Sequence, residues 1–278
     1  MVSDANSLIA SLREADPDRF LCVLASPAEA RGTLAVLYAF NAELARVASS
    51  VTEPGLGMLR FQWWREVVEE GAHGRVRRHP VAEPLARLIA ARGLDPALFD
   101  AVITAREAEL DWSGMPDPPS LEAYAAATAG GLMRIALDAL GVADGASRKA
   151  ALHAGTATAL AGALRNAPAL ARRGRCLLPR ALLADAGARV SDFARAPLPE
   201  PARRVVAAVA EVASGHLASL RSVDVPRAAL PVLLPAALAA RTLRRIARAG
   251  NDLADRRVEG PRITAQWAVF RAALRGRI

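Results

Sequence analysis

Apolar residues recur at every third or fourth position along most of the chain. Between residues 37 and 51 the apolar positions are Leu37, Phe40, Leu44, Val47 and Val51. This spacing places them on one face of an α-helix, whereas the strict alternation that is typical of strands is scarce. The frequent alanines also favour helix, because alanine loses no side-chain entropy when a helix forms. The pattern therefore predicts an all-α protein.

Start and stop signals divide the pattern into consecutive helices. The predicted helices cover residues 26–51, 55–74, 79–93, 95–112, 120–141, 147–167, 201–221 and 227–248. Ser26, followed by Pro27 and Glu29, predicts a capping box at the start of the first helix. No internal repeat and no long linker interrupts the series. We therefore expect one domain over residues 1–278, with 1–15 and 260–278 as peripheral ends and a basic tail at the C-terminus.

Arginine dominates the charge of the chain. Thirty-six Lys and Arg residues against 28 Asp and Glu give a net charge of +8, and Lys149 is the only lysine. Such an excess is compatible with an anionic membrane, a phosphorylated ligand or a solvated surface. The arginines are scattered over many helices, and aromatic residues are not interleaved with them, so nucleic acid is an improbable partner.

The sequence indicates a cytoplasmic protein without a membrane span. The N-terminus has early acidic residues and lacks the basic start and apolar core of a signal peptide. The longest charge-free run, 150–164, is shorter than the roughly 20 residues that a membrane helix needs. Cys22 and Cys176 suggest neither a disulfide framework nor a metal site. A peripheral position on the inner membrane face stays open.

The usual catalytic motifs do not occur in the sequence. The four histidines lack metal-ligand spacing, and no Gly-rich phosphate loop is present. Glu107, Glu109 and Asp111 form an acidic helix end. Glu107 and Asp111 share a helix face, but a solvated charged surface is a better interpretation than a metal clamp.

Several motifs nevertheless resemble a known family. In order, they are "PAEARGTLAVLYAFNAELARV", "LRFQWWREVVE", "HPVAEPLARLI", "YAAATAGGL" and "RRGRCLLP". They are similar to the squalene/phytoene synthase family. This resemblance implies an isoprenoid-synthase-type helical bundle around a central cavity, in which two aspartate-rich motifs bind Mg²⁺ and prenyl diphosphates.

The residues at the aspartate positions depart from the family pattern. In the first motif these positions fall on Ala45, Arg46 and Ser49, and in the second on Asn166 and Leu170. Pro168, inside the second motif, is expected to kink its helix. The resemblance therefore implies no catalytic residue, no metal ligand and no cofactor, with Mg²⁺ needed only if the chain is an active enzyme.

The resemblance also supplies candidates for the cavity. Tyr38, Phe40 and Tyr124 are expected to face the channel, and Arg165 and Arg173 to bind a phosphate group without metal. The segments "FNAELARV", "LRFQWWREVVE" and "LRNAPALARRGRCLLP" are further similar to a divergent branch, the respiratory complex I assembly factor 6 proteins. That branch implies a non-catalytic scaffold or assembly factor whose partners are complex I subunits or a membrane surface.

Two alternatives remain open at this point. One is an active prenyltransferase that condenses two prenyl diphosphates. The other is a metal-free binder of a prenyl, lipid or quinone ligand, because the small residues of "AYAAATAGGLM" and "HAGTATALAGAL" leave room for a ligand or allow close helix packing. The basic groups available to an acidic partner or lipid are Arg172, Arg173 and Arg175, and the helix face of Arg241, Arg244, Arg245 and Arg248.

Overall fold

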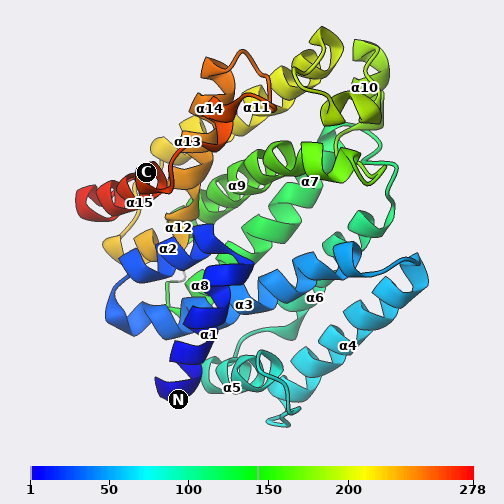
Figure 1. The fold of residues 1–278 in the computed structure, drawn as a ribbon. Helices are drawn as coiled ribbons and strands as arrows, with labels where there is room; N and C mark the ends of the chain where they lie inside the picture. Colours follow the sequence, from blue (N-terminus) through cyan, green and yellow to red (C-terminus); the bar gives the residue numbers. More distant parts are fainter. Residues whose placement is uncertain (1, 143) are drawn as a thin grey trace.

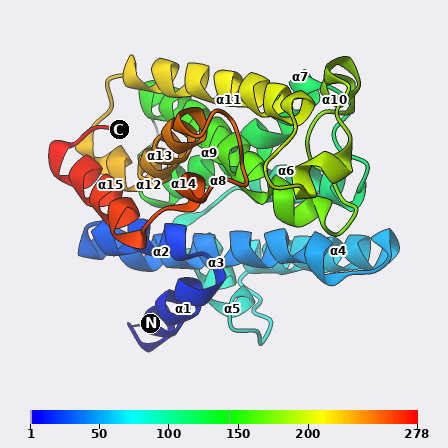
Figure 2. The ribbon, with the colours of Figure 1, turned by 45° about the horizontal axis from the view of Figure 1, so that its top comes forward.

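Helix α9 (Gly145–Ala171) lies at the centre of the molecule and organises the other elements (Figure 1). It contacts helices α7, α8, α11, α12 and α13. Figure 2 shows α11 on one side of α9, and α3 with α4 forming a layer on the other. The buried face of α9 consists mostly of alanine, so its neighbours approach its backbone closely.

The computed structural model describes residues 2–142 and 144–278, with side chains from Leu8 onward. Met1 and Ala143 of the predicted domain lie outside the described residues. The α-helices up to α9 are α1 (Val2–Ala15), α2 (Pro17–Ala25), α3 (Ala28–Ser50), α4 (Pro54–Ala72), α5 (Ala82–Arg92), α6 (Pro96–Glu107), α7 (Pro118–Ala125) and α8 (Gly131–Ala139). Those after α9 are α10 (Arg180–Ala186), α11 (Glu200–Arg221), α12 (Leu230–Leu233), α13 (Pro235–Arg248), α14 (Arg256–Glu259) and α15 (Arg262–Arg275).

Short irregular helices connect some of these elements. They are the 3-10 helices η1 (Ala108–Leu110), η3 (Val190–Ala194) and η4 (Arg227–Ala229), and the π-helical turn η2 (Ala126–Gly130). The described residues form no strand, and their one isolated β-bridge joins Ser113 to Cys176. The all-α prediction is confirmed. The predicted helix 120–141 corresponds to α7, η2 and α8, which follow one another without a gap, and η2 is a π-helical turn in the middle.

The small residues of α9 allow close packing in one part of the helix and line a cavity in another. A Cβ atom on Gly155 would lie 2.3 Å from the backbone nitrogen of Gly130 and 2.4 Å from its Cα, so the two backbones touch here. Further along the same helix, Ala159, Gly162 and Ala163 line a cavity. Both explanations of the small residues therefore hold for α9: some allow close helix packing, and others leave space in a cavity.

Several local predictions hold, and others need correction. The predicted helix start at residue 95 is confirmed, because the Asp95 carboxylate caps α6 and accepts a hydrogen bond from the Ala97 amide at 2.9 Å. The capping box at Ser26 is wrong: the Ser26 hydroxyl donates instead to the Cys22 carbonyl at 2.7 Å, and α3 begins without a side-chain cap. Helix α9 continues through Pro168 to Ala171, beyond the predicted end at residue 167.

Both ends of the chain contain helices. Helix α1 packs against α3, and its Leu8 and Leu12 side chains are buried. Helix α15 occupies the region expected to be a basic tail and contacts α13 and α2 (Figure 2). Among the described residues, no helix has the length and apolar character to cross a membrane.

The contact between Gly155 and Gly130 gives a stability prediction. Gly155→Ala places a methyl group inside the backbone of η2, and overpacking of this kind lowers the free energy of unfolding by about 1–3 kcal/mol. Gly162→Ala, on the same helix, meets no atom within 4 Å. This control is expected to stabilise the helix by roughly 0.5–1 kcal/mol, since alanine has the higher helix propensity. Urea unfolding followed by circular dichroism measures both, and a Gly155→Ala protein as stable as the control would contradict the packing argument.

Candidate functional site

A large cavity lies between the two halves of the helical bundle. Its volume is about 1020 Å³. Its walls come from α2, α3, α9 and α13, from the turn after α9, and from the first turn of α15. The charged residues of the lining are Arg13, Asp16, Asp18, Arg19, Arg46, Arg106, Glu109, Arg165, Arg173, Arg175 and Arg262.

The positions that the family resemblance assigned to aspartates all line this cavity. Ala45 and Ser49 do so from α3, and Asn166 and Leu170 from α9. Arg46 also reaches the cavity, and its guanidinium pairs with Glu43 at 3.1 Å. Two segments more than 100 residues apart in the sequence thus contribute to one surface, as the resemblance implied.

Of the aromatic residues expected to face the cavity, one lines it and two lie in the core. Tyr124 lines the cavity, whereas Tyr38 and Phe40 are fully buried and are not among its lining residues. Phe40 points to the other side of α3, where its ring packs edge-on against Trp64 at 5.3 Å and Phe99 at 5.7 Å. Tyr38 is covered by α2, and the Arg19 guanidinium lies 5.5 Å from its ring centre.

A buried polar network forms part of the cavity wall. Arg106 donates hydrogen bonds to Asn41 Oδ1 at 2.8 Å and to Glu109 Oε1 at 2.6 Å. The Tyr124 hydroxyl donates to the same Glu109 oxygen at 2.6 Å. Burial disfavours the charged guanidinium, but the Glu109 carboxylate raises the pKa of Arg106 above its ordinary value. The network therefore keeps Arg106 charged and holds Arg106 and Glu109 in fixed positions.

The sequence pattern does not predict this network. Glu109 was assigned to a solvated acidic helix end, yet it faces the cavity, whereas the nearby Glu107 pairs with Arg65 at 2.6 Å and Asp111 accepts from Ser113 at 2.6 Å. The 3-10 turn η1 after α6 rotates Glu109 away from the direction that a continuous helix would give it. The three-residue spacing of Arg106 and Glu109 was the one available signal.

The three carboxylates that the described residues contribute to the cavity lining are all bound by arginine. Asp16 pairs with Arg19 at 2.6 Å, Asp18 with Arg165, and Glu109 with Arg106. Burial opposes ionisation of Asp16, but the neighbouring Arg19 guanidinium holds the pKa of Asp16 below its usual value. These pairs leave the carboxylates with their negative charge already compensated.

The predicted anion-binding arginines behave differently from each other. Arg165 and Arg173 both line the cavity, but Arg165 is paired with Asp18. Arg173, like Arg13 and Arg262, makes no side-chain hydrogen bond or ion pair with the described residues. Among the described residues, eight arginines and three carboxylates contribute to the lining, so this part of the cavity wall carries an excess of positive charge. Unpaired guanidinium groups of this kind bind phosphate or carboxylate groups.

The residues present do not fit a Mg²⁺–diphosphate cluster. Magnesium is held by carboxylates and water, whereas the corresponding positions offer the side chains of Ala45, Ser49, Asn166 and Leu170. Arg46 and Arg165 add positive charge beside these positions. Within the described part of the chain, no three His, Cys, Asp or Glu side chains lie close enough together to hold a metal ion.

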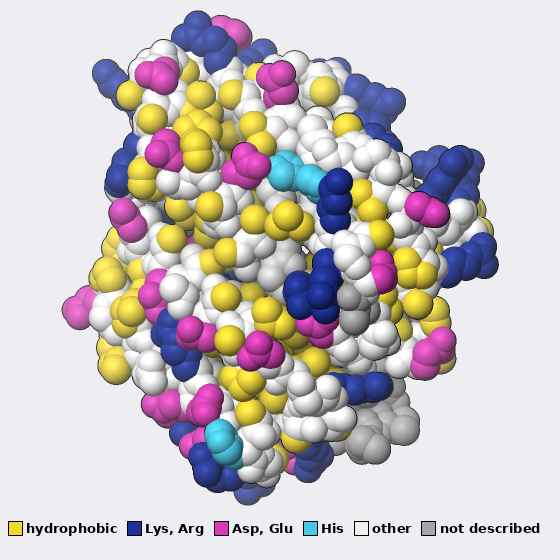
Figure 3. Space-filling view, turned by 180° about the vertical axis from the view of Figure 1, so that it is seen from behind, with side chains coloured by type: hydrophobic (Ala, Val, Ile, Leu, Met, Phe, Trp, Pro, Cys, Tyr) yellow, Lys and Arg dark blue, Asp and Glu magenta, His cyan; other side chains and the backbone are white. Residues whose placement is uncertain are grey.

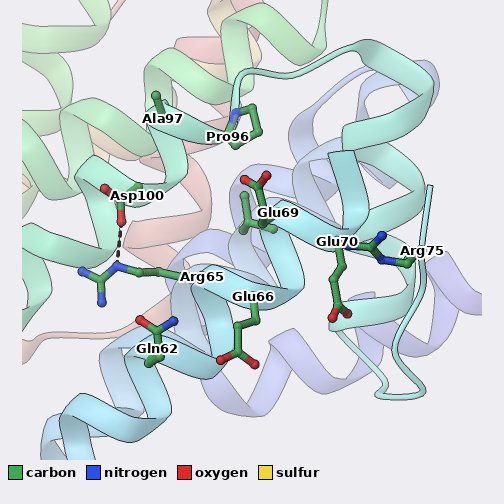
Figure 4. Close-up of a pocket in the computed structure, with 10 residues that line it drawn as sticks. Gln62, Arg65, Glu66, Glu69, Glu70, Arg75, Pro96, Ala97 and Asp100 are labelled. Atoms are coloured by element: carbon green, nitrogen blue, oxygen red, sulfur yellow. Dashed lines mark hydrogen bonds and ion pairs between the residues drawn. The ribbon is translucent and has the colours of Figure 1, made fainter. Parts of the chain in front are cut away.

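A second, smaller hollow of about 610 Å³ lies between α4 and the start of α6 (Figure 4). Most of its charged residues are paired within the protein. Arg65 donates to Asp100 at 2.6 Å, as Figure 4 shows, and Arg77 binds both Glu66 and Glu70. None of the predicted site residues lies here, so the central cavity is the candidate site.

The four arginines of the predicted basic face of α13 differ in their contacts. Arg241 donates to Thr264 Oγ1 and to the Pro261 carbonyl, and Arg245 donates to the Arg257 carbonyl, so these two side chains attach the last helices to α13. Arg244 and Arg248 take no part in this attachment. On the rear face of the molecule, basic, acidic and apolar side chains are interspersed (Figure 3).

Comparison with known proteins gives a consistent result. The squalene/phytoene synthase family profile matches residues 12–264. The chain is 33% identical over 244 residues to complex I assembly factor 6 of Mus musculus and 32% identical to that of Homo sapiens, covering 87% of this chain and 73% of each relative.

Solved structures share the fold at lower identity. A dehydrosqualene synthase in complex with a ligand superposes with a TM-score of 0.83 at 14% identity, covering 98% of this chain and 96% of the other. Squalene synthase HpnC from Alicyclobacillus acidocaldarius gives 0.75 at 20% identity, covering 90% and 95%. The helical bundle, the cavity and the matched profile agree, and the chain belongs to the squalene/phytoene synthase family, in a branch similar to the complex I assembly factor 6 proteins.

Proposed function

We propose that this protein is a non-catalytic member of its family that assists the assembly of respiratory complex I. The observation that carries the proposal is the similarity to complex I assembly factor 6, which extends over 87% of the chain. The cavity supports it, because arginine and uncharged side chains stand at positions where a prenyltransferase needs carboxylates. The protein would bind complex I subunits from the cytoplasmic face of the membrane, without a metal cofactor.

The volume and lining of the cavity favour ligand binding as a second part of this function. A volume of about 1020 Å³ is at the upper end of the range of small-molecule sites. Apolar residues such as Leu170, Leu177 and Leu238 line it together with the unpaired Arg173. We propose that it holds an anionic ligand with an apolar tail, whose charged group is bound by arginine instead of by metal.

Loss of the protein is expected to reduce the amount of assembled complex I. Deletion of its gene in the organism that encodes it should lower NADH:ubiquinone oxidoreductase activity and the complex I band on native gels. Succinate dehydrogenase activity serves as the control for general membrane damage. Unchanged complex I in the deletion strain would contradict the assembly role.

Purified protein is expected to show no prenyl transfer. Farnesyl or geranylgeranyl diphosphate, incubated with and without Mg²⁺, should release no diphosphate and form no condensed hydrocarbon, because each carboxylate described in the cavity lining is paired with an arginine. Diphosphate release and product extraction measure this on protein shown to be folded by circular dichroism. Metal-dependent turnover would establish the active prenyltransferase alternative.

Binding of an anionic prenyl ligand should not require metal. Calorimetric titration with farnesyl diphosphate in EDTA is expected to give saturable binding. Arg173→Ala should weaken it by about tenfold or more, since a charge-assisted hydrogen bond contributes roughly 1.5–3 kcal/mol. Arg92→Ala, which removes an exposed arginine outside the cavity, is the matched control. Binding that needs Mg²⁺, or equal affinities in the two variants, would contradict the arginine site.

A further inference from the structure

Helix α15 packs in an unusual orientation. It turns its small residues Ala265 and Ala272, together with Val269, toward the protein, and all three are buried. Its large apolar residues face outward: Ile263 is 54% exposed, Trp267 62%, Phe270 51% and Leu274 66%. An ordinary surface helix buries its large apolar residues instead.

The exposed residues form one continuous stripe. Positions 263, 267, 270 and 274 follow the four- and three-residue steps of a single helix face. The Trp267 and Phe270 rings touch edge-to-face, with their centres 6.2 Å apart. Scattered exposed apolar residues are normal on a protein surface, but a stripe of this length indicates an interaction site.

Positive charge borders this stripe. Residues 262–278 contain four arginines and neither aspartate nor glutamate. Arg271 on α15 belongs to a cluster of arginines with Arg221, Arg244 and Arg248. Burial and these neighbouring positive charges lower the pKa of Arg244. An apolar stripe with a Trp and a Phe, flanked by arginines, is the pattern of a helix that lies in the interface of an anionic membrane.

The same helix borders the cavity. Its Arg262, Ala265 and Gln266 belong to the cavity lining, whereas Trp267 and Phe270 face away from it. In Figures 1 and 2, α15 lies at the outer edge of the molecule, beside α2, whose Phe20 and Leu21 also line the cavity. A surface bound to the outer face of α15 would therefore lie next to one end of the cavity.

We propose that α15 is an interfacial membrane-binding helix, which docks the protein on an anionic lipid surface through Ile263, Trp267, Phe270 and Leu274. The bordering arginines contact lipid phosphates, and docking brings the α2–α15 end of the cavity to the level of the lipid headgroups. This inference stands on the geometry and charge of α15 and does not require the role in complex I assembly.

Vesicle binding tests the proposal directly. The full-length protein is mixed with vesicles of phosphatidylcholine alone or with added phosphatidylglycerol, and bound protein is separated by flotation. We expect binding to the anionic vesicles, weakened by salt because the arginine contacts are screened. Trp267→Ser/Phe270→Ser should reduce the partition coefficient about tenfold or more, because it removes most of the aromatic surface that enters the lipid.

A matched variant separates this helix from exposed apolar residues in general. Leu56→Ser/Leu59→Ser changes two exposed leucines of α4, which lies on the opposite side of the molecule from α15 (Figure 2), and should leave binding unchanged. Circular dichroism verifies that both variants are folded. No binding to anionic vesicles, or equal binding by the two variants, would overturn the proposal. So would a lipid-free dimer that the Trp267→Ser/Phe270→Ser change converts to monomer, since the stripe would then bind a second copy of the chain.

Discussion

The contact between α9 and the π turn η2 is the constraint on which the rest of the fold depends. The backbones of α9 and η2 are in van der Waals contact at Gly155 and Gly130, and the absence of a Cβ atom on Gly155 is what allows this approach. This contact fixes the position of the central helix. One or two turns further on, Ala159, Gly162 and Ala163 leave space, and the helix and its neighbours enclose a cavity there. A single helix thus supplies both a direct backbone contact and one wall of the central cavity.

The charge that the cavity offers to a ligand depends on which of its charged side chains are already paired within the protein. Buried charges are costly unless they are bound by opposite charges and hydrogen bonds, and the Arg106–Glu109–Tyr124 network meets that condition. Arg173, in contrast, is exposed to solvent at the cavity and costs little to leave unpaired. The inner pairs therefore stabilise the wall, and the exposed arginine remains available for a ligand. An arginine site binds phosphate through charge and hydrogen bonds, whereas a metal site binds it by coordination to a divalent cation held by carboxylates.

The sequence predicted the parts of the structure that depend on periodicity and motif order. The long helices follow from apolar spacing, and the placing of Ala45 and Asn166 on one cavity follows from the family resemblance. The errors arise where tertiary contacts decide. Phe40 turns toward α4 because Trp64 and Phe99 complete an aromatic cluster there. Glu109 enters the cavity because a 3-10 turn changes its direction. The direction of Phe40 has no local sequence signal, and the only signal for Glu109 is its three-residue spacing from Arg106.

Helix α15 shows how a helix can remain attached without burying its large apolar face. Its first turn is fixed by polar contacts, because Arg241 and Arg245 of α13 both donate to Thr264 Oγ1. Its inner face needs only small residues to lie close to the body of the protein. These two features leave the aromatic stripe free of any intramolecular role in packing. A protein stable in water gains nothing from exposing Trp267 and Phe270, so their exposure has its physical rationale in a surface outside the chain.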